Sequence, residues 1–388
     1  MEKAVLILKT RKLLSALLLG ALLLSVPAAA AEEPDTPEPP AVSAQAAILM
    51  EADSGRVLYE KNADEPRLIA STTKILTALL VLERGDIDRV VTIDPAWAGI
   101  EGSTMYLRSG QELTVRDLLY GLLLASGNDA ATALACLTAG SEEAFARQMN
   151  RRAAELGCEN AHFENPSGLD GEEHHASARD LAIITREAIR RPDFCEIVST
   201  PVKTVGELTY TNHNRLLREC PGVFGVKTGY TEAAGRTLVT CCAREGVTLI
   251  CVTLTDPDDW DDHRSLYDWG FQNCRRETLL TGEETWEIPV IGGETETVEV
   301  MPAGALSAVL LREDSGEMDL CLPRFVFPPL GAGDRAGEAV AYVNGAPAGS
   351  IELVYKQGAE RPEVPERRET ALWRRLMGLG ERILVTLS

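Results

Sequence analysis

The sequence contains no CxxC pair, although nine cysteines are spread over its 388 residues. An odd number of cysteines without regular spacing does not describe a disulfide framework or a zinc module. Some of them lie in apolar runs, as Cys251 does between Ile250 and Val252. We therefore expect mostly buried free thiols, with a structural disulfide pattern as the alternative for an exported protein.

Histidine is scarce, with five in the chain, and no two of them stand four residues apart. The segment from Glu172 to His175 gathers carboxylates and imidazoles that could ligate a metal. Since neither a helical histidine pair nor a cysteine pair accompanies it, we interpret this segment as a solvated acidic loop. The sequence predicts no metal and no cofactor.

Positive charge is also in short supply. Lysine and arginine number 38 against 59 aspartates and glutamates, which gives a formal net charge of −21. Such an acidic surface repels phosphate backbones and argues against nucleic acid as a partner. The 45% hydrophobic and 25% charged residues are typical of a globular protein, long enough here for one large domain and a smaller one.

Long apolar runs are missing except near the N-terminus, where residues 13–26 are apolar and follow four cations within residues 3–12. A membrane span needs about 20 apolar residues, so this run is short for one. Together with the small residues at 28–31 it predicts a cleaved secretory signal peptide over residues 1–31, an uncleaved anchor being the alternative. The Pro/Glu-rich stretch that follows predicts a disordered linker over residues 32–45.

Hydrophobic periodicity predicts a helical middle of the chain between two β-rich parts. Apolar runs on both sides of Asp53-Ser54-Gly55 predict a β-hairpin. Helices are predicted at residues 71–82, 115–124, 129–137, 145–156 and 178–189, and strands at 237–242 and 248–255.

Beyond Phe271 the sequence changes to short β-type runs separated by glycine, proline and acidic turns. We expect a small, sandwich-like all-β domain over residues 283–357 and a linker over 358–369. Residues 370–388 repeat apolar side chains at helical spacing beside Arg374, Arg375 and Arg382. This pattern predicts an amphipathic helix in a membrane interface, and docking on the protein itself is the alternative.

Three short motifs follow one another: Ser-Thr-Thr-Lys at 71–74, Ser-Gly-Asn at 126–128 and Lys-Thr-Gly at 227–229. A serine hydroxyl is a weak nucleophile near neutral pH and needs a base within hydrogen-bond reach. Ser71 and Lys74 stand at i and i+3 of a predicted helix and hence share one face. Lys74 can act as the base if burial, the helix N-terminus and a nearby cation disfavour its ammonium form.

The other two motifs supply the remaining groups of an acyl-transfer site. We assign Ser126 to proton transfer between the base and the leaving amine, and Asn128 to orientation of the base and the substrate amide. Lys227 and Thr228 suit a terminal carboxylate. Gly229 lets a substrate approach the strand backbone.

In this order the motifs resemble those of penicillin-binding proteins and class A β-lactamases. Further blocks at residues 165–170, 175–180 and 225–231 resemble the low-molecular-mass D-alanyl-D-alanine carboxypeptidases, and the likeness runs from Ala46 to Phe271. The resemblance implies an α/β (α+β) domain of the β-lactamase and transpeptidase type at residues 46–275, with helices packed on an antiparallel sheet.

The same resemblance implies a function. The enzyme would remove the terminal D-alanine of peptidoglycan stem pentapeptides through an acyl-enzyme on Ser71, with β-lactams as covalent inhibitors. The backbone N–H of Tyr230 would join that of Ser71 in an oxyanion hole. The protein would be exported and attached peripherally to the outer face of the cytoplasmic membrane.

Two features depart from the relatives that the chain resembles. Asp259 stands where some carboxypeptidases carry a basic residue, which leaves carboxylate recognition to Lys227 and Thr228. The segment from Glu164 to Ser167 does not match the element that deacylates class A β-lactamases, so slow turnover of β-lactams is expected. A peptidoglycan D,D-endopeptidase and a non-catalytic cell-wall binding protein remain alternatives, although an intact nucleophile argues against the second.

Overall fold

The computed structural model describes residues 38–362 of the chain. The predicted signal peptide (1–31) and the predicted amphipathic helix (370–388) lie outside these residues, as do parts of both predicted linkers. A search of residues 38–362 finds no helix that combines the length and the hydrophobicity of a membrane span.

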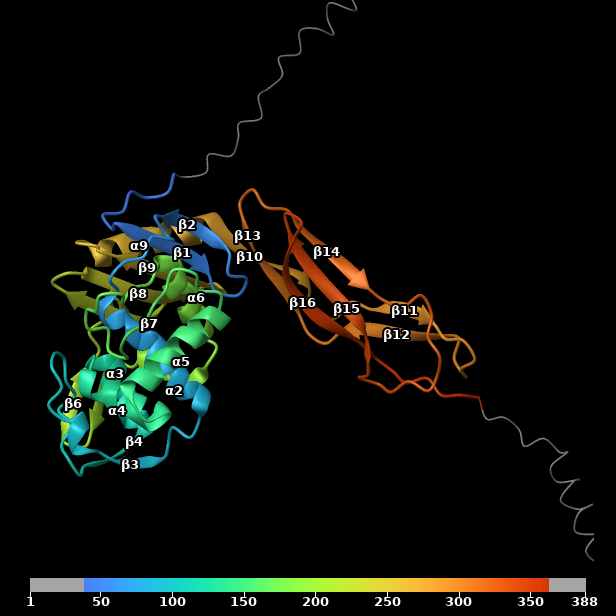
Figure 1. The fold of residues 1–388 in the computed structure, drawn as a ribbon. Coiled ribbons are helices and arrows are strands. Elements are labelled where there is room, and N and C mark those ends of the chain that lie inside the picture. Colours follow the sequence, from blue (N-terminus) through green and yellow to red (C-terminus); the bar gives the residue numbers. More distant parts are fainter. Residues whose placement is uncertain (1–37, 363–388) are drawn as a thin grey trace, which may run out of the picture. The chain divides into compact units, whose positions relative to one another are not determined.

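The larger part of the described chain is built on a five-stranded antiparallel sheet with the strand order β2-β1-β9-β8-β7 (Figure 1). Its strands are β1 (Ala46–Glu51), β2 (Val57–Lys61), β7 (Val223–Thr231), β8 (Gly235–Arg244) and β9 (Val247–Leu254). Two short ribbons accompany it: β3 (Val90–Thr92) with β4 (Glu112–Thr114), and β5 (Val202–Val205) with β6 (Leu208–Thr211).

Helices cover both faces of this sheet (Figure 1). The helical elements of this part are the 3-10 turns η1 (Ala70–Thr73) and η2 (Pro95–Trp97) and the helices α2 (Lys74–Arg84), α3 (Val115–Leu124), α4 (Asn128–Ala139), α5 (Glu142–Glu155), α6 (Ala178–Ala188), α7 (Pro192–Ser199), α8 (Leu216–Glu219) and α9 (Asp259–Asn273). Helix α6 packs against β1 and β9, and α9 packs against β8 and β9.

Alternation along the strands divides the interior into two cores. Ile48 of β1 and Val252 of β9 belong to the core beneath α2, α3, α4 and α6. Leu49 and Cys251, their neighbours along the strands, belong to the core beneath α9. The prediction of helices packed on an antiparallel sheet is thus confirmed, with helices on both faces.

The helical predictions agree with the structure to within a few residues. Helix α3 has the predicted bounds, and the helix predicted from Ser71 begins as the turn η1 and continues as α2 to Arg84. Gly85, which follows α2 directly, adopts a positive φ of 77°. The linker predicted up to residue 45 is wrong at its end, because Val42 and Ala44 are already buried.

The chain after α9 forms the predicted all-β part, which begins earlier than residue 283 (Figure 1). Strands β10 (Cys274–Leu280) and β13 (Leu306–Leu311) pair with each other. A five-stranded sheet in the order β11-β12-β16-β15-β14 contains β11 (Trp286–Pro289), β12 (Thr297–Pro302), β14 (Gly316–Cys321), β15 (Arg335–Val343) and β16 (Ala346–Tyr355).

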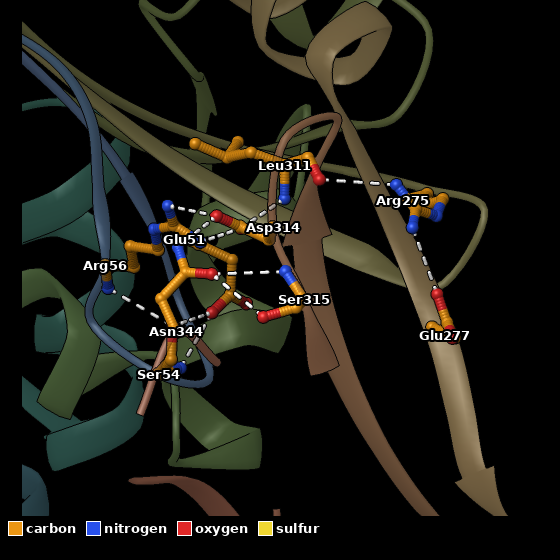
Figure 2. Close-up of polar contacts among 9 residues, drawn as sticks. All are labelled: Glu51, Ser54, Arg56, Arg275, Glu277, Leu311, Asp314, Ser315 and Asn344. Atoms are coloured by element: carbon orange, nitrogen blue, oxygen red, sulfur yellow. Dashed lines mark hydrogen bonds and ion pairs between the residues drawn. The ribbon is translucent and has the colours of Figure 1, made fainter. Parts of the chain in front are cut away.

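Asp314, in the turn between β13 and β14, joins this part to the hairpin of β1 and β2 (Figure 2). Its carboxylate binds both terminal nitrogens of Arg56 and accepts hydrogen bonds from Leu311 N (2.6 Å) and Asn344 Nδ2 (2.7 Å). The hairpin turn itself is held by Glu51, whose carboxylate accepts the N–H of Ser54 at 2.7 Å. A buried carboxylate with several donors therefore ties the two sheets together.

All nine cysteines are free thiols. Cys220, Cys241, Cys242 and Cys251 are buried, Cys321 is exposed, and the other four are half-buried. The prediction of free thiols agrees with this arrangement. The expectation that most of them are buried does not, because four of the nine are buried.

Candidate active site

Ser71 lies in a turn that its own neighbours hold in shape. It belongs to η1, directly before α2, and Ala70 in front of it has a positive φ of 47°. The hydroxyls of Thr72 and Thr73 donate to the carbonyls of Ile69 (2.6 Å) and Ala70 (2.9 Å). Ser71 is thereby fixed at the start of a helix, where backbone N–H groups lack helical acceptors.

Strand β7 passes close to the nucleophile because Gly229 has no side chain. A Cβ at Gly229 would lie 2.3 Å from Thr237 Oγ1 and 3.0 Å from Ser71 N. Thr237 Oγ1 in turn donates to the carbonyl of Ile69 at 3.1 Å and ties β8 to the turn. The Lys-Thr-Gly motif therefore lies within a strand, and the close approach of that strand to η1 requires glycine.

Lys74 is fully buried, and its Nζ has three acceptors. It lies 2.9 Å from Ser71 Oγ and 2.8 Å from Asn128 Oδ1, and it also donates to the carbonyl of Ser167. Burial, and then the positive charge of Lys227, hold the pKa of Lys74 well below its usual range. A neutral lysine in this position can accept the proton of the serine, as the sequence predicts.

Asn128 begins α4 and is anchored to the loop that precedes α3. Its Nδ2 donates to the carbonyl of Glu101 and its N–H to that of Ser103, both at 2.7 Å. The next residue, Asp129, is buried and accepts the N–H of Met105 at 3.0 Å. These bonds leave Oδ1 of Asn128 to face the lysine, and its predicted orienting role stays a prediction that this contact supports.

Ser126 lines the same cleft as Ser71. The fold thus brings the first and second motifs together, as the contact between Lys74 and Asn128 also shows. Its backbone has a positive φ of 58°, and it is 5% exposed. Its hydroxyl makes no hydrogen bond to any residue between 38 and 362. The predicted role in proton transfer stays a prediction that this free hydroxyl supports.

The carbonyl of Ser167 is a site group that sequence reasoning missed. Asn165 Oδ1 accepts the N–H groups of Ser167 (3.1 Å) and Gly168 (2.8 Å) and so shapes the turn. Gly168 has φ +84°, and a Cβ there would lie 1.9 Å from the carbonyl oxygen of Ala70. The Asn-Pro-Ser-Gly block showed family likeness, but a backbone carbonyl that binds Lys74 leaves no side-chain signature.

Lys227 points away from solvent. It is 2% exposed, its Nζ donates to the carbonyl of Thr228 at 2.7 Å, and burial lowers its pKa to about 7. Thr228, Gly229 and Tyr230 line the cleft, and Tyr230 is 65% exposed. Within the Lys-Thr-Gly motif, Lys227 therefore lies in the interior, and Thr228 and Gly229 line the cleft.

The cleft has a volume of about 520 Å³. Five of its lining residues were predicted for the site: Ser71, Ser126, Thr228, Gly229 and Tyr230. Five others were not: Ser103, His213, Arg236, Asp259 and Trp260. The second group comes from two loops, from β8 and from the start of α9, segments that only the tertiary structure brings together.

The interpretation of residues 172–175 as a solvated loop is wrong for His174. This side chain is 2% exposed, with Nε2 2.8 Å from Thr73 Oγ1 and Nδ1 accepting the N–H of Glu164 at 3.1 Å. Burial lowers its pKa to about 4, so it is neutral and packs behind the η1 turn. Glu172 and Glu173 are exposed as expected, and residues 38–362 contain no group of three or more potential metal ligands.

Comparison with known proteins decides the family. The sequence profile of peptidase family S11, described as D-alanyl-D-alanine carboxypeptidase, matches residues 33–258. The chain belongs to this family. It is a serine peptidase with the D-alanyl-D-alanine carboxypeptidase activity of the penicillin-binding proteins.

Individual relatives extend the likeness past the catalytic part. The D-alanyl-D-alanine carboxypeptidase DacF of Bacillus subtilis (strain 168) is 33% identical over 355 residues, which cover 86% of this chain and 91% of the relative. Penicillin binding protein 5 from Haemophilus influenzae superposes with a TM-score of 0.66 at 30% identity, over 83% of this chain and 99% of that one. A peptidoglycan synthesis regulatory factor (PBP3) from Streptococcus pneumoniae superposes with a TM-score of 0.74 at 28% identity, over 82% of this chain and 100% of that one.

We expect Lys74→Met to abolish acylation of Ser71, because this near-isosteric change removes the nitrogen that lies 2.9 Å from the hydroxyl.

In the wild type the acylation rate should fall as pH drops through the lowered pKa of Lys74, since an ammonium cannot accept a proton. Lys227→Met removes the neighbouring cation, so it should raise the pKa of Lys74 and move this acid limb to higher pH.

Stopped-flow acylation by a chromogenic cephalosporin measures both effects, and thermal unfolding followed by circular dichroism controls for the fold. A Lys74→Met variant acylated within a few fold of the wild-type rate would show that another group is the base.

Proposed function

We propose that this chain removes the terminal D-alanine from peptidoglycan pentapeptides through an acyl-enzyme on Ser71. The observation that carries the proposal is the 2.9 Å contact between Lys74 Nζ and Ser71 Oγ, made by a fully buried lysine with a strongly lowered pKa. The nucleophile of this pair lines an open cleft that a peptide terminus can enter.

In the first half-reaction, neutral Lys74 takes the proton of Ser71, whose Oγ attacks the carbonyl carbon of the penultimate D-alanine. The backbone N–H groups of Ser71 and Tyr230 stabilise the oxyanion. The proton passes from the lysine through the Ser126 hydroxyl to the leaving nitrogen, and the C–N bond breaks. A water molecule, deprotonated by Lys74, then hydrolyses the ester and restores the serine.

The backbone geometry supports the oxyanion hole. Ser71 N lies 3.0 Å from where a Cβ of Gly229 would be, so the N–H of the nucleophile adjoins the residue before Tyr230. A carbonyl oxygen between η1 and β7 would therefore be close to both donors. Their position depends on backbone alone, so no side-chain rearrangement is needed when the negative charge develops.

β-Lactams should form a lasting acyl-enzyme. The carboxylate of Glu164, in the segment compared with the deacylating element of β-lactamases, is exposed and accepts the N–H of Glu173 at 3.2 Å. The Glu164 carboxylate therefore binds within its own loop, and the hydrogen-bond partner of Ser71 Oγ is Lys74. The acyl group of a β-lactam would thus lack a dedicated second base for its hydrolysis.

We expect a fluorescent penicillin to label the mature protein covalently, with the label on Ser71 in the tryptic peptide identified by mass spectrometry. Ser71→Ala should abolish labelling, since the attacking oxygen is gone, while thermal unfolding stays close to that of the wild type. Persistent labelling of the alanine variant would place the nucleophile elsewhere.

The product should be free D-alanine from a peptide that ends in D-Ala-D-Ala. Amidation of the terminal carboxylate should reduce kcat/KM by roughly 10- to 150-fold, the value of one charge-assisted hydrogen bond. Amino-acid analysis of the released product, with both substrates at matched concentration, measures the ratio. Equal cleavage of the two peptides would favour the D,D-endopeptidase, because a cross-bridge cutter has no terminal carboxylate to bind.

The C-terminal segment would attach the enzyme to the outer face of the cytoplasmic membrane. Residues 370–388 combine apolar positions at helical spacing with Arg374, Arg375 and Arg382, a composition that suits an interface with anionic lipid. Deleting this segment should release the protein from anionic vesicles in a sedimentation assay and leave hydrolysis of a soluble peptide unchanged. If the full-length protein does not sediment with such vesicles, docking on the protein itself becomes the better explanation.

A further inference from the structure

Arg236 is the cation that a ligand in the cleft would meet. Among the residues that line the cleft with Ser71, it is the one with a permanent positive charge. The pKa of His213 is lowered by burial and by Lys227, so this imidazole is neutral at neutral pH. Lys227 does not line the cleft, and its Nζ already donates to the carbonyl of Thr228.

The register of β7 and β8 explains why Lys227 and Arg236 reach different places. Arg236 stands opposite Tyr230. Thr228 stands opposite Leu238, which packs in the core beneath α9. Opposed residues project to the same face, and neighbours along a strand project to opposite faces. Thr228 and Arg236 therefore share the α9 face of the sheet, and Lys227 projects toward the core beneath α2.

Two residues at the start of α9 hold Arg236 in place. Its Nη2 donates to Asp259 Oδ1 at 2.5 Å, and its Cζ lies 5.3 Å from the ring centre of Trp260. The Asp259 side chain is 4% exposed and the Arg236 side chain 41%, so the guanidinium is the more accessible partner of this ion pair. Arg236 Nε is buried and has no acceptor within residues 38–362, so a ligand in the cleft would meet the terminal nitrogens of the guanidinium. One edge of the guanidinium is thus fixed by protein, and further donors remain for a ligand.

We propose that Arg236, together with the Thr228 hydroxyl, binds the terminal carboxylate of the substrate peptide. The proposal rests on the carboxypeptidase function proposed above, and it gives Arg236 the part that the sequence had suggested for Lys227. Asp259 is a positioning residue, since it orients the guanidinium of Arg236 and does not itself bind the substrate carboxylate. A planar guanidinium suits a carboxylate better than an ammonium does, because it offers parallel N–H donors.

The test compares free and amidated forms of one acyl-D-Ala-D-Ala peptide on the wild type and on Arg236→Gln. Glutamine keeps a side-chain donor for Asp259 and removes the charge. For the free peptide, kcat/KM should fall by roughly 10- to 150-fold. For the amidated peptide it should stay within about two-fold of the wild-type value, so the preference for a free carboxylate disappears. The loss should appear mainly in KM, because the carboxylate makes the same contact in the bound substrate and in the transition state.

Arg215→Gln is the matched control. Arg215 Cζ lies 5.2 Å from the same Trp260 ring, yet its side chain does not line the cleft. This variant should retain the wild-type ratio between the two peptides. If Arg236→Gln unfolds, the double variant Arg236→Gln/Asp259→Asn removes the unpaired buried charge and is measured in its place.

The outcomes separate the two proposals. A wild type that releases no D-alanine from either peptide would contradict the proposed function. A wild type that prefers the free peptide, with the same preference kept in Arg236→Gln or in its double variant, would overturn the role of Arg236. Loss of the preference in Lys227→Met alone would return that role to Lys227.

Discussion

Burial of the Lys74 amine is the constraint on which the rest of the site depends. A cation withdrawn from water is costly unless acceptors surround it, and burial therefore favours the neutral amine. The three acceptors at Nζ are Ser71 Oγ, Asn128 Oδ1 and the carbonyl of Ser167. The ammonium donates to all three; the neutral amine donates to the last two and accepts the proton of Ser71. One set of contacts thus serves both protonation states, so proton transfer needs little rearrangement.

Each of these acceptors is held by a different part of the fold. Asn128 is bound through its other polar atoms to the loop before α3, and buried Asp129 fixes the same loop. Asp129 also acts on the base directly, since its negative charge opposes the lowering of the pKa of Lys74. Ser167 belongs to a turn shaped by Asn165 and seated against Ala70. A change in any of these segments would therefore be felt at the nucleophile through the lysine.

The sequence predicted what depends on local pattern. The helix periodicity located α3 to the residue, and the three motifs pointed to Ser71, Lys74 and Gly229, which the structure brings close together. It could not find groups that act through the backbone or through tertiary proximity. The carbonyl of Ser167 has no side-chain signal, and Arg236 lines the cleft because β8 pairs with β7 and α9 packs beside β8. His174 was misjudged for the same reason, since its burial depends on a contact with Thr73 far away in sequence.

The two faces of β7 and β8 separate two electrostatic tasks that conflict if one cation performs both. Burial and a positive charge nearby both favour the neutral form of Lys74, and Lys227 supplies that charge from the interior, where burial lowers its own pKa to about 7. Carboxylate binding needs a charge that does not vanish near neutral pH and that a ligand can reach. An arginine keeps its charge across that range, and Arg236 stands on the cleft side. Substrate recognition can then stay constant with pH while the reactivity of the serine titrates with its base.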